Sequence, residues 1–231
     1  MTREPDTDNA GVGIIVQRTN NNTIGVFPMV FFIWSDSMEN SSKKNNVKRL
    51  VISAMFIAIS VAINELLKFD LTFIHGGSVT AFSMVPLALI GWTWGIKWGF
   101  ACGAIMGLID MFIGGLANFS YVSGIVAYLV LILFDYIVAY GCAGLVGIVK
   151  NKIKNKTVAI GIGTAFACIL RFICHFLTGV TIWADYSENI TAVIIGSITY
   201  NGAYMLPELI ITVIGCVAIV NIKPIMNSLE K

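Results

Sequence analysis

Long apolar stretches with almost no charge are the feature that most restricts how this chain can fold. Of its 231 residues, 57% are hydrophobic and only 12% are charged, whereas a typical soluble domain has about 25% charged residues. The mean hydropathy of +0.82 agrees with this bias. A helix that crosses a bilayer needs about 20 apolar residues, so the composition predicts one polytopic membrane domain embedded in the lipid bilayer.

Apolar segments of suitable length recur along most of the chain. We therefore expect an all-α fold, a bundle of six transmembrane helices. The second helix is short and contains Pro86, so we expect it to be kinked or tilted. The expected helices cover residues 47–67, 79–94, 96–114, 120–149, 157–181 and 190–222.

The basic residues between these helices are distributed unequally, and this bias predicts the orientation. With six spans, eleven lysines and arginines fall on one side of the membrane and only Lys68 falls on the other. Because basic loops stay in the cytoplasm, we expect both termini to be cytoplasmic. The eleven are Lys43, Lys44, Lys48, Arg49, Lys97, Lys150, Lys152, Lys154, Lys156, Lys223 and Lys231.

The first 37 residues differ from the rest. Their apolar stretch, residues 24–34, is too short to cross a bilayer. Met38 begins a polar and basic segment that leads directly into the first expected helix. We expect residues 1–37 to be a poorly structured extension with a natural start at Met38, and residues 38–231 to form the six-helix membrane domain.

Motifs of catalysis and metal binding are absent from the sequence. It has no HExxH, GxSxG, P-loop or Rossmann glycine pattern. The five cysteines all lie in apolar runs without a CxxC spacing, which argues against a metal site or a disulfide framework. We expect no catalytic residue, no metal, no cofactor and no nucleic-acid partner, and the pattern favours binding or transport.

Polar side chains inside apolar spans are costly and usually functional. Arg171, His175 and Gly179 are spaced by four and share one face of a helix. From their distances along the helices, we expect Asp135, His175 and Asn201 to lie between the outer third and the midplane of the membrane, in one pocket open to the outside. The candidate pocket residues are Asp135, Tyr136, Arg171, His175, Gly179, Trp183, Asn201 and Tyr204.

This set of side chains suits an organic cation with a hydrogen-bonding ring. A carboxylate supplies charge, and imidazole and amide groups supply donors and acceptors. Aromatic rings supply faces for stacking and cation–π attraction, although Trp183 by position is equally well an interfacial belt residue. Arg171 and Glu208 are expected to lie deeper, and a structural ion pair is favoured there over contact with the substrate.

Two ladders of small residues predict close helix packing. Glycines recur every fourth residue over 91–107, and we expect them to pack inside the bundle. For a similar alanine ladder two interpretations stay open, internal packing or docking of another membrane protein. Its members are Ala54, Ala58 and Ala62.

Four segments of the chain, in order and at matching membrane depth, resemble the ThiT family, the thiamine-specific substrate-binding subunits (S components) of energy-coupling factor (ECF) transporters. The resemblance covers residues 48–222. The segments are GGSVTAFSMVP (76–86), FDYIVAYGCAGLVG (134–147), RFICHFLTGVTIWADY (171–186) and SITYNGAY (197–204).

The resemblance implies which residues surround the aminopyrimidine and thiazolium rings of thiamine, and that the alanine ladder docks on a shared transmembrane subunit. Three features of some relatives are missing here. A tyrosine before the last helix's asparagine is replaced by Gly196, and a glutamine before the acidic–tyrosine pair is replaced by Leu131. A glutamate before Pro86 is absent from residues 81–83. A pyrimidine or thiazole precursor therefore stays open as ligand. By resemblance the thiamine contacts are Asp135, Tyr136, Arg171, His175, Gly179, Trp183 and Asn201.

The resemblance also implies a mechanism, namely high-affinity capture in the bacterial cell membrane without catalysis. A transmembrane coupling subunit and two ATPase subunits are the implied partners, and the loop over residues 68–78 is a candidate lid with glycine hinges at 76 and 77. Two alternatives remain from the residues alone. One is a stand-alone, proton-coupled carrier using Asp135, His175 or Glu208, and the other is an intramembrane enzyme using Asp110 and Asp135.

Overall fold

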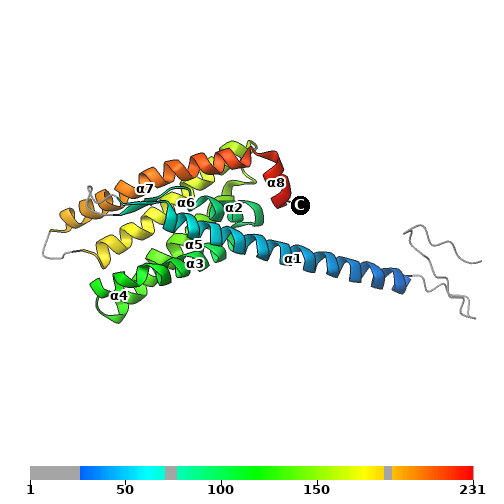
Figure 1. Ribbon diagram of the computed structural model, residues 1–231, viewed down its shortest axis with the longest axis horizontal. Coiled ribbons are helices and arrows are strands. Elements are labelled where there is room, and N and C mark those ends of the chain that lie inside the picture. The colour runs from blue at the N-terminus through cyan, green and yellow to red at the C-terminus, as the bar shows by residue number, and fades with distance from the viewer. Residues whose placement is uncertain (1–26, 71–76, 185–188, 231) are drawn as a thin grey trace, which may run out of the picture. The chain divides into compact units, whose positions relative to one another are not determined.

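The computed structural model describes residues 27–70, 77–184 and 189–230 (Figure 1). The chain divides into two compact units, Met1–Lys48 and Arg49–Lys231. Helix α1 begins at Phe27 in the first unit and ends at Leu66 in the second, which also contains all later elements of the described chain. Residues 1–26 lie outside the described part, so the expectation of a separate extension over residues 1–37 stays a prediction.

Helices make up nearly all of the described structure, with a few turns of 3₁₀ and π geometry in the middle of the chain. In order they are α1 (Phe27–Leu66), α2 (Val85–Trp94), α3 (Ile96–Ile113), the 3₁₀ helix η2 (Gly115–Tyr121), α4 (Ile125–Val130), the π-helix η3 (Leu131–Val138), α5 (Ala139–Ala143), the 3₁₀ helix η4 (Gly144–Val149), α6 (Lys156–Thr181), α7 (Ile190–Val220) and α8 (Lys223–Glu230).

Five helical segments in the described residues are long and apolar enough to cross a membrane. The other apolar helix, α2, has only 10 residues, which is less than a straight span requires. Nearly the whole of α2 is buried, from Val85 to Trp92, which explains why it is apolar all round. The five long segments are Lys43–Leu66, Ile96–Ile113, Ile125–Val149, Lys156–Thr181 and Ile190–Val220.

A two-stranded antiparallel sheet replaces the expected start of the second helix. Strand β1 (Lys68–Asp70) pairs with β2 (Ser78–Thr80), so that Lys68 lies opposite Thr80. Turns then occupy residues 81–84, where Phe82 has a φ of +67°, and the helix begins only at Val85. The expected helix over 79–94 was therefore too long at its start. Residues 71–76 of the predicted lid lie outside the described residues.

The glycine ladder packs inside the bundle, as the spacing predicts, at four of its five positions. A Cβ added at Gly91, Gly99, Gly103 or Gly107 would collide with backbone carbonyl oxygens of residues 136–144. Because these glycines have no side chain, the backbones of α2 and α3 can contact the backbone of residues 136–144 directly. Gly95 differs, because its φ of +91° forms the break between α2 and α3 and no atom lies near its missing Cβ.

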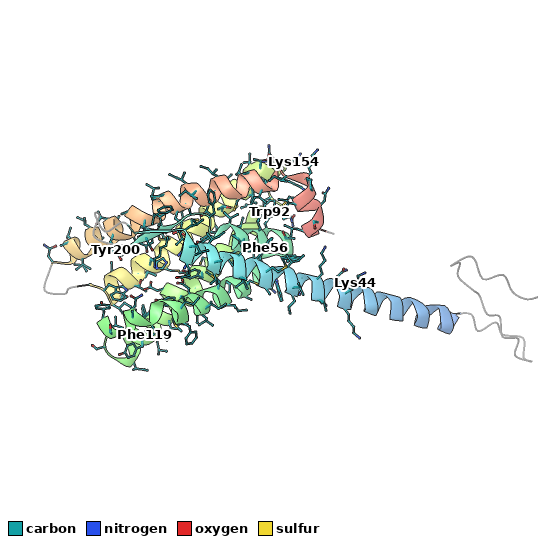
Figure 2. The ribbon with its side chains drawn as sticks, in the orientation of Figure 1. Lys44, Phe56, Trp92, Phe119, Lys154 and Tyr200 are labelled. Carbon is teal, nitrogen blue, oxygen red and sulfur yellow. The ribbon has the colours of Figure 1, made fainter. Side chains whose placement is uncertain are left out.

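The loops of the second unit gather at two opposite ends of the helices. Figure 2 places Phe119 and Tyr200 toward one end, and Trp92 and Lys154 toward the other. Around Trp92, side chains of α1, α2, α6, α7 and α8 form one apolar cluster, in which Phe56 also packs. The basic loop between η4 and α6 therefore lies at the end opposite Phe119 and Tyr200.

Candidate substrate-binding site

A cavity of about 680 Å³ lies among α3, the π-helix η3, α5, α6 and α7. Its size is within the usual range of small-molecule sites, about 300–1,000 Å³. All eight residues that the sequence suggested for the pocket line it, although they come from three separate stretches of the chain. They are Asp135, Tyr136, Arg171, His175, Gly179, Trp183, Asn201 and Tyr204.

The carboxylate of Asp135 is the centre of the polar wall. It accepts hydrogen bonds from the hydroxyl of Thr178, from Nδ1 of His175 at 3.0 Å and from Nε1 of Trp183 at 3.3 Å. Only 14% of the Asp135 side chain is exposed. Asp135 lies in the π-helix Leu131–Val138, a geometry that occurs often at functional sites.

One ring nitrogen of His175, Nε2, is available for a hydrogen bond to a ligand. In a neutral imidazole whose Nδ1 donates to Asp135, Nε2 is an acceptor, and this buried atom has no hydrogen-bond partner within the described part of the chain. Buried polar atoms are normally satisfied. His175 lines the cavity, and an amino group on a ligand is the kind of donor that Nε2 lacks.

The hydroxyl of Tyr136 is committed to the protein. It donates to the carbonyl oxygen of Gly115 at 3.2 Å and accepts from the amide of Asn118 at 2.9 Å. Both partners belong to the 3₁₀ segment Gly115–Tyr121. These bonds hold the Tyr136 ring against the cavity, so stacking is the contribution that it can make to a ligand.

Helices α6 and α7 approach each other closely at Gly179. A Cβ there would collide with the hydroxyl of Ser197. Next to this contact, the amide of Asn201 donates to the carbonyl oxygens of Ser197 and His175 at 3.0 and 3.3 Å, and its oxygen accepts from Tyr204 at 2.8 Å. Asn201 therefore links α6 and α7 by hydrogen bonds, and fewer of its donors and acceptors remain for a ligand than the sequence suggested.

The expected ion pair forms part of the cavity wall. Nη1 of Arg171 lies 2.7 Å from Oε1 of Glu208, and both residues are buried. The Arg171 guanidinium also lies 4.8 Å from the centre of the Tyr140 ring, and the hydroxyl of Thr80 in β2 donates to Glu208 at 3.3 Å. The preference for a structural pair agrees with these bonds, although Arg171 also reaches the cavity.

Several cavity residues were not among the predicted ones, and helical spacing could have indicated some of them. Thr178 lies three residues after His175 and Ser197 four before Asn201, so each shares a face with a candidate. Asp110 was considered only as an enzymatic acid. The additional polar lining residues are Asp110, Asn118, Tyr121, Tyr140, Thr178, Ser197 and Tyr200.

Negative charge exceeds positive charge in the cavity wall. Glu208 neutralises Arg171, whereas Asp110 and Asp135 have no lysine or arginine bound to them among the described residues. A low-dielectric cavity strengthens the field of such carboxylates. The site therefore favours a cationic ligand with flat rings.

Comparison with known proteins agrees with this chemistry. A family described as "Thiamine transporter protein (Thia_YuaJ)" matches residues 50–228. The chain belongs to this thiamine transporter family. A curated relative of Bacillus subtilis (strain 168), "Thiamine transporter ThiT", is 31% identical over 184 residues, which cover 76% of this chain and 90% of the relative.

A second relative has the same name as the first, and a solved structure shares the fold. "Thiamine transporter ThiT" of Lacticaseibacillus paracasei is 22% identical over 184 residues, 74% of this chain and 89% of the relative. The structure of ThiT from Listeria monocytogenes superimposes with a TM-score of 0.60 at 18% identity, covering 79% of this chain and 98% of that one. The solved structure shows that the fold is shared.

Membership of the thiamine transporter family confirms the function expected from the sequence. The chain is a multi-pass bacterial membrane protein of the ThiT type, the S component of ECF transporters, and a transport subunit rather than an enzyme. The enzyme alternative based on Asp110 and Asp135 is thereby set aside. In the structure these two carboxylates line the same cavity.

The alanine ladder lies on the outer face of α1. Ala54, Ala58 and Ala62 are all exposed, whereas Ile57 and Asn64 of the same helix are buried. Internal packing within the described structure therefore does not account for the ladder. Its role in docking stays a prediction.

Proposed function

We propose that this chain captures thiamine with high affinity in the cavity around Asp135 and delivers it to an ECF-type importer. The observation that carries the proposal is that all eight candidate residues line one cavity, in whose wall carboxylates outnumber lysines and arginines. Thiamine combines a permanently cationic thiazolium ring with an aminopyrimidine, and both of its rings are flat. A carboxylate, an imidazole and several aromatic faces are the groups that such a molecule needs.

Each wall of the cavity has a part in this proposal. Asp135 attracts the cation or accepts from the amino group, and Nε2 of His175 accepts the second hydrogen bond. Trp183, whose exposed fraction is 40%, stacks on a ring at the mouth, with Tyr136 and Tyr204 as further aromatic faces. The remaining residues, Arg171, Gly179 and Asn201, hold the wall in shape beside the ligand.

Six spans with both termini in the cytoplasm form part of the same proposal, α2 being the short sixth. The basic loop around Lys154 and the residues Phe119 and Tyr200 lie at opposite ends (Figure 2). Tyr200 lines the cavity, so a cytoplasmic Lys154 loop places the cavity toward the outside. This orientation suits a protein that collects a vitamin from the medium.

Delivery requires partners in this proposal. The exposed ladder Ala54, Ala58 and Ala62 gives a transmembrane coupling subunit close access to the α1 backbone. Two ATPase subunits bound to that partner supply the energy, since this chain has no P-loop. A stand-alone, proton-coupled carrier is the competing arrangement.

Titration of the purified full-length chain tests the proposal. Calorimetry with thiamine, with its isolated aminopyrimidine alcohol and with its isolated thiazole alcohol compares the whole ligand with its two halves. We expect saturable binding of thiamine below micromolar concentration and much weaker binding of each half. Absence of saturable binding at micromolar thiamine would refute the ligand, and a half that binds as tightly as thiamine would assign the chain to a precursor.

A further inference from the structure

A second, smaller cavity of about 200 Å³ adjoins the first, and we name it the annex. Asp135 and Trp183 line only the larger cavity. Thr80 and Lys68, from the two strands, line only the annex. The residues that line both, and so lie between them, are Asp110, Tyr140, Arg171, His175, Tyr200 and Tyr204.

The annex is lined by polar groups wherever the structure describes the chain. Apart from Gly77, each described residue that lines it has a polar side chain. An apolar ring inserted there would separate these groups from water without replacing their hydrogen bonds, which is costly. The volume is that of about six or seven water molecules at about 30 Å³ each. It suits a short polar substituent, while the rings of a ligand fit the aromatic part of the larger cavity.

The charges of the annex do not favour an anion. Arg171 is paired with Glu208 at 2.7 Å, and Lys68 is exposed, so solvent and salt screen its charge. Among the described residues, the remaining charge between the two cavities is Asp110, which accepts from Asn64 and Tyr140, each at 2.7 Å. Both of these donors are neutral.

Asp110 can accept further hydrogen bonds. An ionised carboxylate offers about four lone-pair sites, and the two donors occupy two of them. Asp110 also lines both cavities, so its free acceptor sites are within reach of a ligand that extends from one into the other.

We infer that the annex is a subsite for a short, uncharged, hydroxyl-bearing arm of the substrate, and that Asp110 is the residue that selects this arm. The inference rests on the proposed function, since thiamine has one such arm, the hydroxyethyl group of its thiazolium ring. Asp110 accepts a hydrogen bond from the hydroxyl. The same negative charge repels an arm that ends in a phosphate ester, so one residue both attracts the hydroxyl arm and excludes the phosphorylated one.

Three ligands that share the same rings test this inference on the full-length chain. They are thiamine, the analogue with an ethyl group in place of the hydroxyethyl arm, and thiamine monophosphate. Dissociation constants are measured by calorimetry for wild type, Asp110→Asn and the control Glu65→Gln. Glu65 is an exposed carboxylate on α1 that lines neither cavity. It accepts at 3.3 Å from the same Asn64 amide that donates to Asp110, so its neutralisation tests for unspecific charge effects and for changes at this shared amide.

For wild type we expect thiamine to bind at least about tenfold more tightly than either analogue, the size of a hydrogen bond to a charged group. In Asp110→Asn both preferences should fall by about tenfold, whereas Glu65→Gln should keep them. A purely structural role for Asp110 would weaken all three ligands equally. Thiamine binding with unchanged preferences would overturn the inference, and no binding of thiamine to wild type would instead refute the proposed function.

A second variant keeps the test decisive if Asp110→Asn does not fold. Lys68→Glu changes an exposed side chain at the annex and adds negative charge beside the proposed arm. In titrations at low ionic strength, where the charge of an exposed side chain is screened least, we expect the monophosphate to lose at least about threefold relative to thiamine, while the preference over the ethyl analogue stays the same. An unchanged ratio between monophosphate and thiamine would place the arm elsewhere.

Discussion

Replacing the carboxylate of Asp135 by an amide is the sharpest perturbation of the proposed thiamine site. Three donors converge on this carboxylate, from His175, Thr178 and Trp183. Asp135→Asn keeps the volume but removes the charge. It also places an NH₂ group beside donors that bind a carboxylate oxygen in the wild type. The substitution therefore weakens hydrogen bonds within the cavity wall as well as the contact with the ligand.

The magnitude depends on burial. Because only 14% of the Asp135 side chain is exposed, its attraction for a cation is weakly screened, and removing one partner of a buried charge pair leaves the other uncompensated. We expect thiamine affinity to fall by about 2–4 kcal/mol, roughly 30- to 1,000-fold. An exposed ion pair would contribute only about 0–1 kcal/mol, so the size of the loss reports whether the contact is buried.

Two independent readouts measure this loss. Trp183 remains in the variant, so quenching of tryptophan fluorescence tracks binding, and calorimetry gives the same constant without a probe. Glu65→Gln is the matched control, because it neutralises an exposed carboxylate outside the cavity, and its affinity should stay within about twofold of wild type. Thiamine affinity that Asp135→Asn leaves unchanged in folded protein would refute the assigned pocket while keeping the ligand.

Other parts of the structure give further predictions. Trp183→Ala should weaken thiamine by about 1–2 kcal/mol by calorimetry, less than Asp135→Asn, because it removes stacking and one hydrogen bond to Asp135 while His175 and Thr178 still donate to that carboxylate; a loss as large as that of Asp135→Asn would contradict this order. Gly179→Leu should lower both the melting temperature and the affinity through its collision with Ser197, whereas Gly202→Ala, which meets open space on the same helix pair, should lower neither. Ala58→Trp should reduce thiamine uptake in cells and spare binding to the purified chain; a parallel loss of binding would indicate internal packing. In liposomes with a proton gradient, the chain alone should not accumulate thiamine, and accumulation would establish a stand-alone carrier.

The part of the site on α6 was predictable because a long helix keeps its period. Arg171, His175 and Gly179 are spaced by four, and such residues share a face wherever the helix is regular. Helix α6 runs unbroken from Lys156 to Thr181. The same holds for Asn201 and Tyr204 on α7, so counting along the sequence was enough to predict that residues of both helices line one cavity.

The segment expected as one helix over 120–149 was less predictable. It contains α, π and 3₁₀ turns in succession. In a regular α-helix, residues five apart point about 140° away from each other. Helical periodicity alone therefore does not predict that Asp135 and Tyr140 line the same cavity. The π-helix between them, with its wider i→i+5 turns, changes the relation, and both residues line the cavity. Such a local change of period is not visible in a run of apolar residues.

The β pairing could not be predicted from local pattern either. Ser78–Thr80 continues directly toward the apolar run of α2, and its partner Lys68–Asp70 lies on the far side of a loop. Each strand has only three residues, too few for an alternating pattern to be distinguished from a helix start. Yet Thr80 binds Glu208 and lines the annex, so these strands contribute to the site.

Hydrogen-bonding capacity divides the polar residues of the bundle into structural and ligand-facing ones. Glu208 is bound by Arg171 and Thr80, and Asn201 is bound by its helix neighbours. His175 and Arg171 instead each have a buried nitrogen, Nε2 and Nε, without a partner within the described residues, and Asp110 has acceptor sites in excess of its donors. Polar groups in lipid are retained only where something satisfies them. The sequence shows that all of these residues need partners, but only their positions in space show which of them still have free hydrogen-bonding capacity, and at those residues we expect a ligand to contribute most binding energy.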